Sequence, residues 1–89
     1  MSNVFIAFPT NDETRSIVDA IMADNPGATL DEQPAMVRVI REKSLTIKRA
    51  TVEENMGRNF DLQELHVHLL TLTGHIDETD EEFTLAWHQ

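Results

Sequence analysis

Three of the four histidines lie close together, at positions 66, 68 and 75. His66 and His68 are two residues apart, so on a β-strand both imidazoles would project from the same face, a spacing that some metal sites use. His75 or a carboxylate is a conceivable third ligand, but the chain has no cysteine and no further carboxylate is placed to complete the set. We therefore expect histidines that are hydrogen-bonded at a strand edge or at a partner surface, with no bound metal and no other cofactor.

Nucleophilic catalysis requires a nucleophile beside a base that can take its proton. Ser16 and Ser44 have no histidine near them in the sequence, and the three glycines form no phosphate-binding loop. The carboxylates fall mostly in predicted helix caps and in exposed runs. The sequence therefore predicts a protein that is not an enzyme.

The charged residues are unevenly distributed along a chain of 89 residues with a net charge of -9. Five of the seven basic residues lie between Arg38 and Arg49, whereas residues 77–82 include five acids. A strongly negative protein is repelled by the phosphates of nucleic acids and attracted by basic protein surfaces. We expect a protein partner and no nucleic acid, although both charged runs are also typical of solvated faces.

Composition also limits the compartment and the size of the core. The lack of cysteine indicates no disulfide framework and fits a cytoplasmic protein. No stretch approaches the roughly 20 apolar residues of a membrane helix, and we expect no membrane contact. A chain of this length predicts one domain, residues 1–89, with a single core.

Residues 67–72 form the longest apolar run, in which every residue except His68 is apolar or a threonine. A run of this length, bounded by Asp61 and Gly74, is typical of a strand that is covered on both faces. The sequence therefore predicts that Val67–Leu72 is the central strand. Thr71 and Thr73 would share one face of it, where they would contact a partner or serve only as good strand residues.

Helices are predicted at three capping boxes, in which an N-cap side chain and a glutamate three residues later bind each other's backbone amides. The boxes are Thr10–Glu13, Thr51–Glu54 and Asp61–Glu64. The first opens a helix that ends at Asn25-Pro26-Gly27, the second opens a short helix that ends at Gly57, and the third opens about one turn.

Other strands are predicted from short apolar or alternating runs. They cover residues 3–8, 36–41, 45–50 and 83–87, with residues 28–33 as an edge strand or an ordered connection. A hairpin is expected to join the strands on either side of residues 42–44. Phe60 and Trp87 are expected in the core. The predicted fold is α+β, a small mixed sheet with helices packed on it, in the approximate order β-α-β-β-β-α-α-β-β.

Three motifs resemble the small effector proteins of bacterial multicomponent monooxygenases, and most of all the phenol hydroxylase branch. They are Ser16-Ile17-Val18-Asp19-Ala20-Ile21, Gly57-Arg58-x-Phe60-Asp61-Leu62 and Phe83-x-Leu85-x-Trp87. The resemblance implies a cofactor-free regulatory subunit that binds a diiron hydroxylase and couples NADH and O2 consumption to hydroxylation of phenol-like aromatics. Competition with the reductase for the hydroxylase is possible. We expect no counterpart of the long N-terminal extension of the methane-oxidising branch, so no role of that tail is carried over.

Two surfaces are candidates for docking on such a hydroxylase. The segment from Asn59 to Thr73 is the expected anchor, and its candidate residues are Asn59, Asp61, His66, His68, Thr71 and Thr73. The acidic residues Asp80, Glu81 and Glu82 are expected to steer association. Two alternatives are a stand-alone domain that senses a small molecule between helix and sheet, and a metal-binding protein that uses the histidines.

Overall fold

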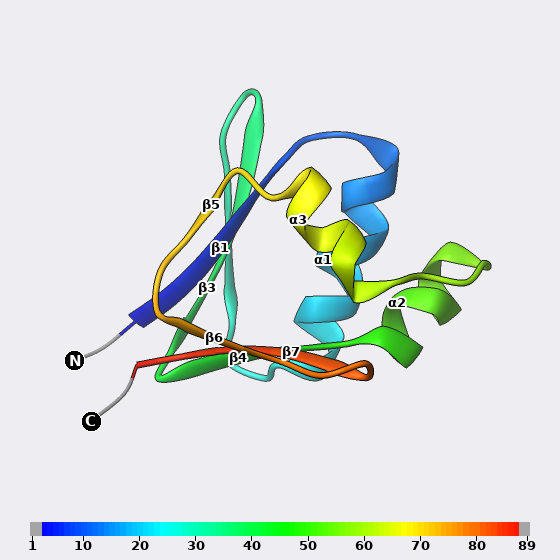
Figure 1. Ribbon diagram of the computed structural model, residues 1–89. Helices are drawn as coiled ribbons and strands as arrows, with labels where there is room; N and C mark the ends of the chain where they lie inside the picture. Colours follow the sequence, from blue (N-terminus) through cyan, green and yellow to red (C-terminus); the bar gives the residue numbers. More distant parts are fainter. Residues whose placement is uncertain (1–2, 88–89) are drawn as a thin grey trace.

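The computed structural model describes residues 3–87, which form two antiparallel sheets with the helices packed between and beside them (Figure 1). The four-stranded sheet A has the order β2-β3-β1-β5, and the three-stranded sheet B has the order β4-β7-β6. Sheet A contains β1 (Asn3–Pro9), β2 (Thr29–Glu32), β3 (Met36–Glu42) and β5 (Thr71–Leu72). Sheet B contains β4 (Ser44–Lys48), β6 (His75–Glu78) and β7 (Glu82–Ala86).

The helices are α1 (Asp12–Asp24), α2 (Arg49–Met56), the single 3₁₀ turn η1 (Leu62–Glu64) and α3 (Leu65–His68). The α+β class is confirmed. The element order differs from the prediction in two places: the helix α3 lies between η1 and β5, where a strand was expected to begin at Val67, and β6 was not predicted. The strands also form two antiparallel sheets instead of one mixed sheet. No helix within residues 3–87 is long and apolar enough to span a membrane.

The central strand of sheet A is β1, not the predicted Val67–Leu72. β1 pairs with β3 on one side and with β5 on the other. Val4, Ile6 and Phe8 are fully buried, because alternate residues of the strand point toward the helices. The Val67–Leu72 run instead starts in α3 and ends in the two-residue edge strand β5, so it has a sheet neighbour on one side only.

α1 begins one residue later than the predicted capping box. Asn11 is the N-cap and accepts from the Thr14 amide, while the Thr14 hydroxyl accepts from the Asn11 amide. Thr14 is fully buried and its hydroxyl also lies 2.5 Å from the carbonyl of Pro9, which ties the helix start to β1. The predicted end at Asn25 is confirmed. The Asn25 side chain exchanges two hydrogen bonds with the backbone of Thr46 and so joins α1 to β4.

The hairpin predicted around residues 42–44 does not form. β3 pairs with β1 and β2, whereas β4 pairs with β7 in the other sheet. Lys43, with φ of 75°, is the single residue between them. One residue is too short for a turn that would let the two strands pair, and the chain instead turns a corner from sheet A to sheet B.

α2 starts at Arg49, so Thr51 lies inside the helix and the predicted Thr51–Glu54 capping box is wrong. Its N-cap, Lys48, makes no side-chain cap hydrogen bond. The predicted end is confirmed: Gly57 has φ of 72° and its amide donates to the Glu53 carbonyl. The third box is also confirmed, since Asp61 caps η1 and Glu64 accepts from the Asp61 amide.

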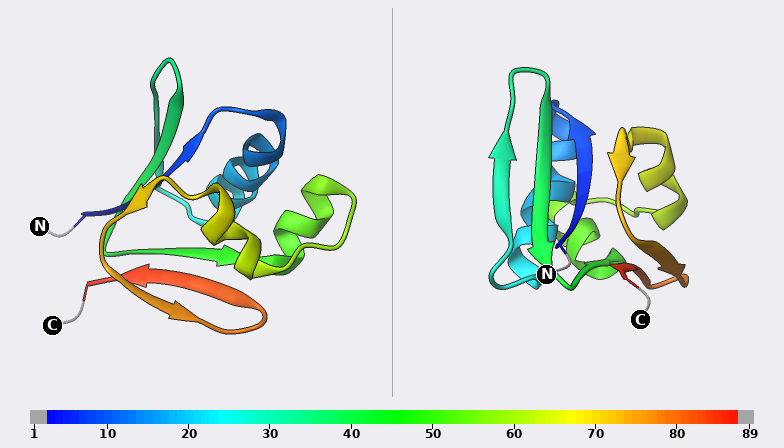
Figure 2. Two further views of the ribbon diagram at one scale, coloured as in Figure 1. Left: turned by 45° about the horizontal axis from the view of Figure 1, so that its top comes forward. Right: turned by 90° about the vertical axis from the view of Figure 1, so that its left-hand side faces the viewer.

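The C-terminal hairpin of β6 and β7 supplies the apolar face of sheet B. Phe83 and Leu85 are fully buried beside Leu45 and Ile47 of β4. Phe60 is buried as predicted, but Trp87 is not in the core, because 43% of its surface is exposed. The Trp87 indole N–H donates to the Asn3 carbonyl at 2.9 Å and so links the end of β7 to the start of β1. Figure 2 shows the two sheets meeting along this edge.

Candidate functional site

The three clustered histidines do not converge. His66 and His68 lie on α3 instead of on a strand, and His75 lies on β6. The Nε2 atom of His66 is 3.0 Å from Oε1 of Glu78 on β6, and that of His68 is 3.2 Å from Oε2 of Glu13 on α1. Among residues 3–87 no group of three or more histidine and carboxylate side chains is placed to hold a metal ion. The two imidazoles instead attach α3 to the elements on either side of it.

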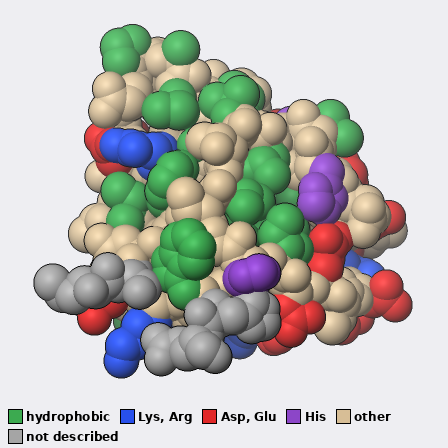
Figure 3. Space-filling view, turned by 60° about the vertical axis from the view of Figure 1, so that its left-hand side comes forward, with side chains coloured by type: hydrophobic (Ala, Val, Ile, Leu, Met, Phe, Trp, Pro, Cys, Tyr) green, Lys and Arg blue, Asp and Glu red, His purple; other side chains and the backbone are tan. Residues whose placement is uncertain are grey.

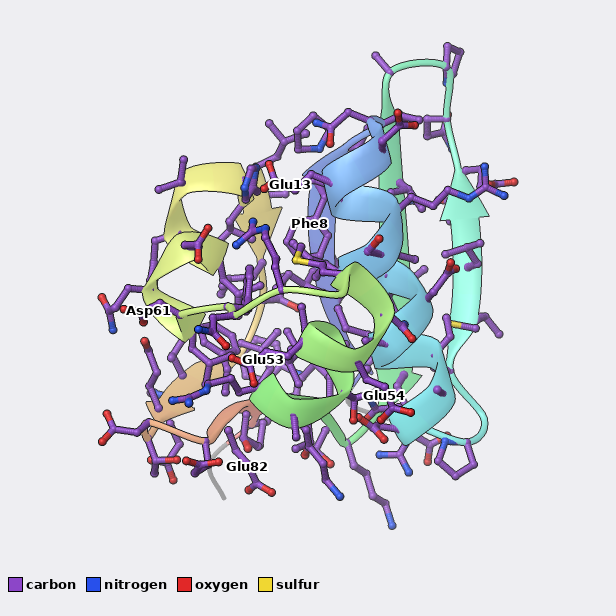
Figure 4. All side chains as sticks on the ribbon, turned by 90° about the vertical axis from the view of Figure 1, so that its right-hand side faces the viewer. Phe8, Glu13, Glu53, Glu54, Asp61 and Glu82 are labelled. Carbon is purple, nitrogen blue, oxygen red and sulfur yellow. The ribbon has the colours of Figure 1, made fainter. Side chains whose placement is uncertain are left out.

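A second set of polar contacts fixes the segment that leads into α3. Arg58 Nη2 lies 2.6 Å from Glu13 Oε1 and 3.4 Å from Glu64 Oε1. These hydrogen bonds raise the pKa of Arg58 above its usual value, and the hydrogen bond to Glu13 has the larger effect. The amide of Asp61 is the main cause that lowers the pKa of Glu64, and Arg58 adds to it. Figure 4 shows Glu13 at the start of α1 and Asp61 before η1 on the side of the molecule where these contacts form.

The predicted anchor segment, residues 59–73, does not form one continuous surface. Asn59 and Asp61 line an open polar groove of about 550 Å³ together with Asp80. Glu53 of α2 also lines the groove, and its carboxylate accepts from the Phe60 amide at 2.8 Å (Figure 4). Thr71 and Thr73 instead lie at the edge of sheet A, beyond α3. The start of the predicted anchor, at Asn59 and Asp61, therefore lies beside Asp80. The end of the anchor, at Thr71 and Thr73, lies on a different part of the surface.

Residues 77–82, expected as an acidic loop, are only partly a loop: Asp77 and Glu78 end β6, and a tight turn then leads to Glu82 at the start of β7. Thr79 holds this turn, since the Thr79 hydroxyl accepts from the amides of Glu81 and Glu82. The Glu81 carbonyl accepts from the Arg49 amide at 2.9 Å, which joins the turn to α2. The side chains of Asp80, Glu81 and Glu82 are exposed and concentrate negative charge at one end of the molecule.

Thr73 has a structural contact that explains part of its position. Its hydroxyl accepts from the Phe5 amide at 3.1 Å, and its own amide donates to the Phe5 carbonyl at 3.0 Å. These bonds extend the pairing of β5 with β1 beyond its two formal residues. Thr71 is exposed on β5 and opposite Ala7, so only Thr71 of the two presents an exposed side chain.

A set of exposed apolar side chains that was not predicted from the sequence lies along the chain from α3 to Trp87. Their exposed fractions are 81% for Val67, 54% for Leu70, 43% for Ile76 and 43% for Trp87. Exposed apolar side chains that gather on one flank are typical of interaction sites. A helical signal was present, because Leu62, Leu65 and Leu69 recur at i, i+3 and i+7, and it would have placed Val67 on the outer side of a helix.

A family model described as MmoB/DmpM matches residues 2–86. The chain belongs to the MmoB/DmpM family. Among curated members, it is 50% identical over 86 residues to the stimulatory component DmpM of phenol 2-monooxygenase from Pseudomonas sp. (strain CF600), covering 97% of this chain and 96% of that one. It is 28% identical over 75 residues to the effector subunit of the alkene monooxygenase system of Xanthobacter autotrophicus (strain ATCC BAA-1158 / Py2), covering 82% and 72% of the two chains.

Solved structures of the family agree with this fold. A chain of a phenol hydroxylase–regulatory protein complex superposes with a TM-score of 0.93 at 44% identity, covering 98% of this chain and all of that one. The regulatory protein B of soluble methane monooxygenase shares the fold, with a TM-score of 0.78 at 15% identity over 97% of this chain and 65% of that one. The family expected from the three motifs is confirmed.

Family membership also decides the class of activity. The curated MmoB/DmpM relatives are named as stimulatory or effector components of monooxygenase systems. The chain is accordingly a regulatory component and not a catalytic one. Its functional site is therefore a surface. The candidates within residues 3–87 are the acidic turn and the exposed apolar side chains of Val67, Leu70, Ile76 and Trp87, which we call the apolar flank.

Proposed function

We propose that this protein is the regulatory component of a phenol hydroxylase and binds its diiron hydroxylase. In the bound state it couples NADH and O2 consumption to hydroxylation of phenol-like aromatics in the cytoplasm. The single observation that carries the proposal is the nearly full-length identity to a phenol 2-monooxygenase stimulatory component. A regulatory chain of the same fold within a phenol hydroxylase complex supports the choice of partner.

The proposed mechanism is a shift of the hydroxylase between two conformations. A protein that binds one conformation more tightly by about 1–3 kcal/mol changes that equilibrium roughly 5- to 150-fold. The regulatory protein needs no cofactor for this, because all of the chemistry occurs in the hydroxylase. It needs a surface that fits only one of the two conformations.

The test is a reconstituted assay with hydroxylase and reductase. We expect the regulatory protein to raise both the rate and the amount of hydroxylated product per NADH consumed. The comparison is made at saturating regulatory protein, and heat-denatured protein serves as the control. Equal rate and equal coupling with and without the folded protein would rule the function out.

The acidic turn has a separate role in the proposal. Asp80, Glu81 and Glu82 are exposed at one end of a protein with a net charge of -9, so they would accelerate the encounter with a basic surface without being packed in the complex. Replacing all three by their amides should lower the association rate constant and its salt dependence, with little change in activity at saturation. Loss of saturated activity would instead place the turn inside the interface.

Asn59, Asp61, His66 and His68 remain proposed partner contacts with an added structural role for three of them. Asp61 caps η1, and the two histidines bind Glu78 and Glu13, whereas Asn59 is exposed beside the groove. Asn59→Ala therefore tests this surface with the smallest effect on folding. A change in saturated turnover or coupling, with an unchanged melting temperature, is expected if Asn59 contacts the hydroxylase.

Reductase and regulatory protein would compete if their hydroxylase surfaces overlap. Excess reductase should then raise the apparent dissociation constant of the regulatory protein in proportion to the reductase concentration. An apparent constant that does not change with reductase would show separate surfaces.

A small-molecule role has one observation in its favour. An open groove of about 500 Å³ lies between the start of α1 and the β2–β3 strands, with Val18, Leu30 and Val37 among its lining residues. If it binds an aromatic effector, phenol should raise the melting temperature of the free protein in a saturable way. An unchanged melting temperature at millimolar phenol would remove this candidate.

A further inference from the structure

β2 is the last strand at one edge of sheet A, and its outer side has no neighbouring strand. Within residues 3–87 it pairs only with β3. The β2–β3 hairpin extends beyond the rest of the molecule in Figure 1, and β2 forms the outer margin of the sheet in the right-hand view of Figure 2. An open strand edge presents unpaired backbone groups to which another extended chain can bind.

The pairing register shows which backbone groups of β2 are open. Gln33 and Met36 exchange hydrogen bonds of 2.7 and 3.4 Å next to the hairpin loop. In an antiparallel pair, residue pairs that are hydrogen-bonded alternate with pairs that are not. Thr29 and Asp31 are therefore bonded to β3. The amide and carbonyl groups of Leu30 and Glu32 point outward from the sheet.

The side chains of Leu30 and Glu32 lie on the helical side of sheet A. Leu30 is opposite Val39, and Glu32 is opposite Val37. Opposite residues of paired strands project from the same face of a sheet. Val37 and Val39 are buried in the core, so this is the face that α1 covers. Figure 4 shows β2 alongside α1 on this side of the molecule.

A groove of about 500 Å³ lies between α1 and this edge, and we call it the β2 groove. Val18 and Val37 line it with side chains that are almost completely buried, whereas the side chain of Leu30 is 43% exposed. A chain bound to the open edge would place every second side chain over the groove. Backbone pairing and side-chain contact are therefore available at the same place.

The rim of the β2 groove is negative. Asp12 and Asp19 of α1 and Glu32 of β2 line the groove together with one cation, Arg15, and all four side chains are exposed. Three carboxylates and one guanidinium leave a negative balance at neutral pH. The rim therefore attracts basic side chains.

We infer that the β2 edge and groove bind an extended segment of a partner protein in which an apolar and a basic residue are two positions apart. The segment adds a strand to β2 through the open backbone groups, which is a common mode of peptide recognition. Its apolar side chain contacts Leu30 and its basic side chain lies beside Glu32, because neighbouring strands bring side chains of one face together. The inference goes beyond the proposed function and does not depend on it.

This surface is separate from the two surfaces considered for the hydroxylase. None of the residues that line the β2 groove belongs to the acidic turn or to the apolar flank. Figure 3 shows the opposite side of sheet A, where hydrophobic side chains gather across the middle of the view. Occupancy of the β2 groove can therefore be measured without the hydroxylase.

Charge and backbone pairing decide against other occupants. A second copy of this chain that paired β2 with β2 would bring two negative rims together. Nucleic acids and anionic membranes would be repelled by the same carboxylates. A small aromatic molecule would fill only the groove and would leave the backbone groups of Leu30 and Glu32 unpaired. A basic extended segment satisfies both the edge and the rim.

The test is an NMR titration of the full chain, labelled with ¹⁵N, with the peptide acetyl-Thr-Lys-Thr-Val-Thr-Lys-Thr-amide. The peptide is symmetric about its valine, so it presents a valine and a lysine two positions apart whether it binds parallel or antiparallel to β2. The matched control peptide has glutamate in place of both lysines. Low ionic strength is used, because salt screens contacts between exposed charges.

We expect the lysine peptide to bind at least tenfold more tightly than the glutamate peptide. At saturation the amide signals of Leu30 and Glu32 should shift, and hydrogen exchange of these two amides should slow at least threefold, because each becomes bonded to the peptide. The amides of Thr29 and Asp31 should keep their exchange rates, since they are already bonded to β3. This alternation distinguishes strand addition from general attraction between opposite charges.

Two substitutions on β2 test the side-chain contacts. Leu30→Ser should raise the dissociation constant of the lysine peptide at least threefold. Glu32→Lys should raise it at least fivefold and should lower that of the glutamate peptide. Glu81→Lys in the acidic turn is the matched control, because it changes the net charge equally at an exposed position outside the groove. It should change either constant less than twofold, and circular dichroism with thermal melting checks that each variant folds.

Three kinds of result would overturn the inference. Unshifted Leu30 and Glu32 amides at millimolar lysine peptide would show that the edge accepts no strand. Equal binding of the two peptides, or equal effects of Glu32→Lys and Glu81→Lys, would show that the rim does not select a basic segment. Leu30 and Glu32 signals that shift with the concentration of the protein alone would give the edge to a second copy of this chain.

Discussion

Two apolar runs of this chain have opposite environments. Residues 4–8 in β1 are buried except for Phe5, which is half-buried, whereas residues 67–72 include Val67 and Leu70 with more than half of their surface in solvent. β1 has a strand on each side and α1 over one face, while the second run lies at a sheet edge. The comparison teaches that an apolar run in the sequence does not by itself distinguish a strand buried in the core from a segment whose side chains are exposed at the surface.

The largest expected difference between the two runs concerns stability. Phe8 is fully buried and belongs to the core cluster, so Phe8→Ala should lower the free energy of unfolding by about 3–5 kcal/mol through lost burial and a residual cavity. Urea denaturation followed by circular dichroism measures it. A loss below about 1 kcal/mol would mean that β1 is not the centre of the core.

The second prediction concerns Gly74, which follows the second apolar run and lies against Val4 of β1 and Ala86 of β7. A Cβ at Gly74, where φ is 102°, would lie 3.1 Å from Val4 Cγ1 and 3.3 Å from the Ala86 carbonyl oxygen. Gly74→Ala should therefore cost about 1–3 kcal/mol from backbone strain and crowding together.

Gly27→Ala is the control for Gly74→Ala. Gly27 also has a positive φ, of 87°, but a Cβ there meets nothing within 4 Å. It carries only the backbone strain, so its cost should be about 1 kcal/mol. If both variants lose the same stability in urea, the close approach of β1, β6 and β7 at Gly74 contributes nothing.

Local signals in the sequence predicted most of the elements. The apolar stripe of α1, the left-handed Gly57 and the capping box at Asp61 each depend on neighbouring residues only, and each was found. In β3 and β4, the apolar residues Val37, Val39, Leu45 and Ile47 occur at every second position, and these are the buried ones. These features follow from backbone geometry that a few adjacent residues determine.

What the sequence did not predict depends on partners far along the chain. β3 and β4 join different sheets because the single residue Lys43 links them and because β4 pairs with β7, which comes much later in the chain. The apolar run after His66 has the same composition as a buried strand, and only the position of β5 beside β1 leaves it at an edge. The candidate site was missed for this reason, since an exposed Leu70 looks like a core residue in the sequence.

Substitution of Leu70 separates stability from binding. Leu70→Ala should lower the free energy of unfolding by less than about 1 kcal/mol, because little of the side chain is removed from water, although the sequence alone predicted a core position. Leu72→Ala, at a side chain that packs against the core, should cost more. Urea denaturation of both variants gives the comparison, and a larger loss for Leu70→Ala would place that residue in the core.

The smallest expected effect concerns how the segment before the apolar run is attached to the core. The Asp61 amide donates to Glu64 Oε2 at 3.0 Å and Arg58 lies near Oε1, and in that order they lower the pKa of Glu64. A carboxyl group with a lowered pKa in the folded state stabilises the fold above its unfolded pKa, and that contribution disappears as the pH falls through the folded value. Glu64→Gln keeps an acceptor for the Asp61 amide but loses the charge. The parent should therefore be more stable than the variant at pH 7, by less than about 1 kcal/mol because the site is partly solvated.

This difference should shrink as the pH is lowered from about 4.5 toward 3, the range below the ordinary glutamate pKa. Urea denaturation of parent and variant at pH 7, 5, 4 and 3 measures it. Glu54→Gln on the exposed side of α2, labelled in Figure 4, is the matched control, and comparison with it shows whether the pH dependence is specific to residue 64. Because parent and variant differ only at residue 64, the difference reports the loss of that charge and of its contacts with Arg58 and the Asp61 amide. A difference that stays constant or grows on acidification would mean that the charge of Glu64 does not attach the apolar flank to the core.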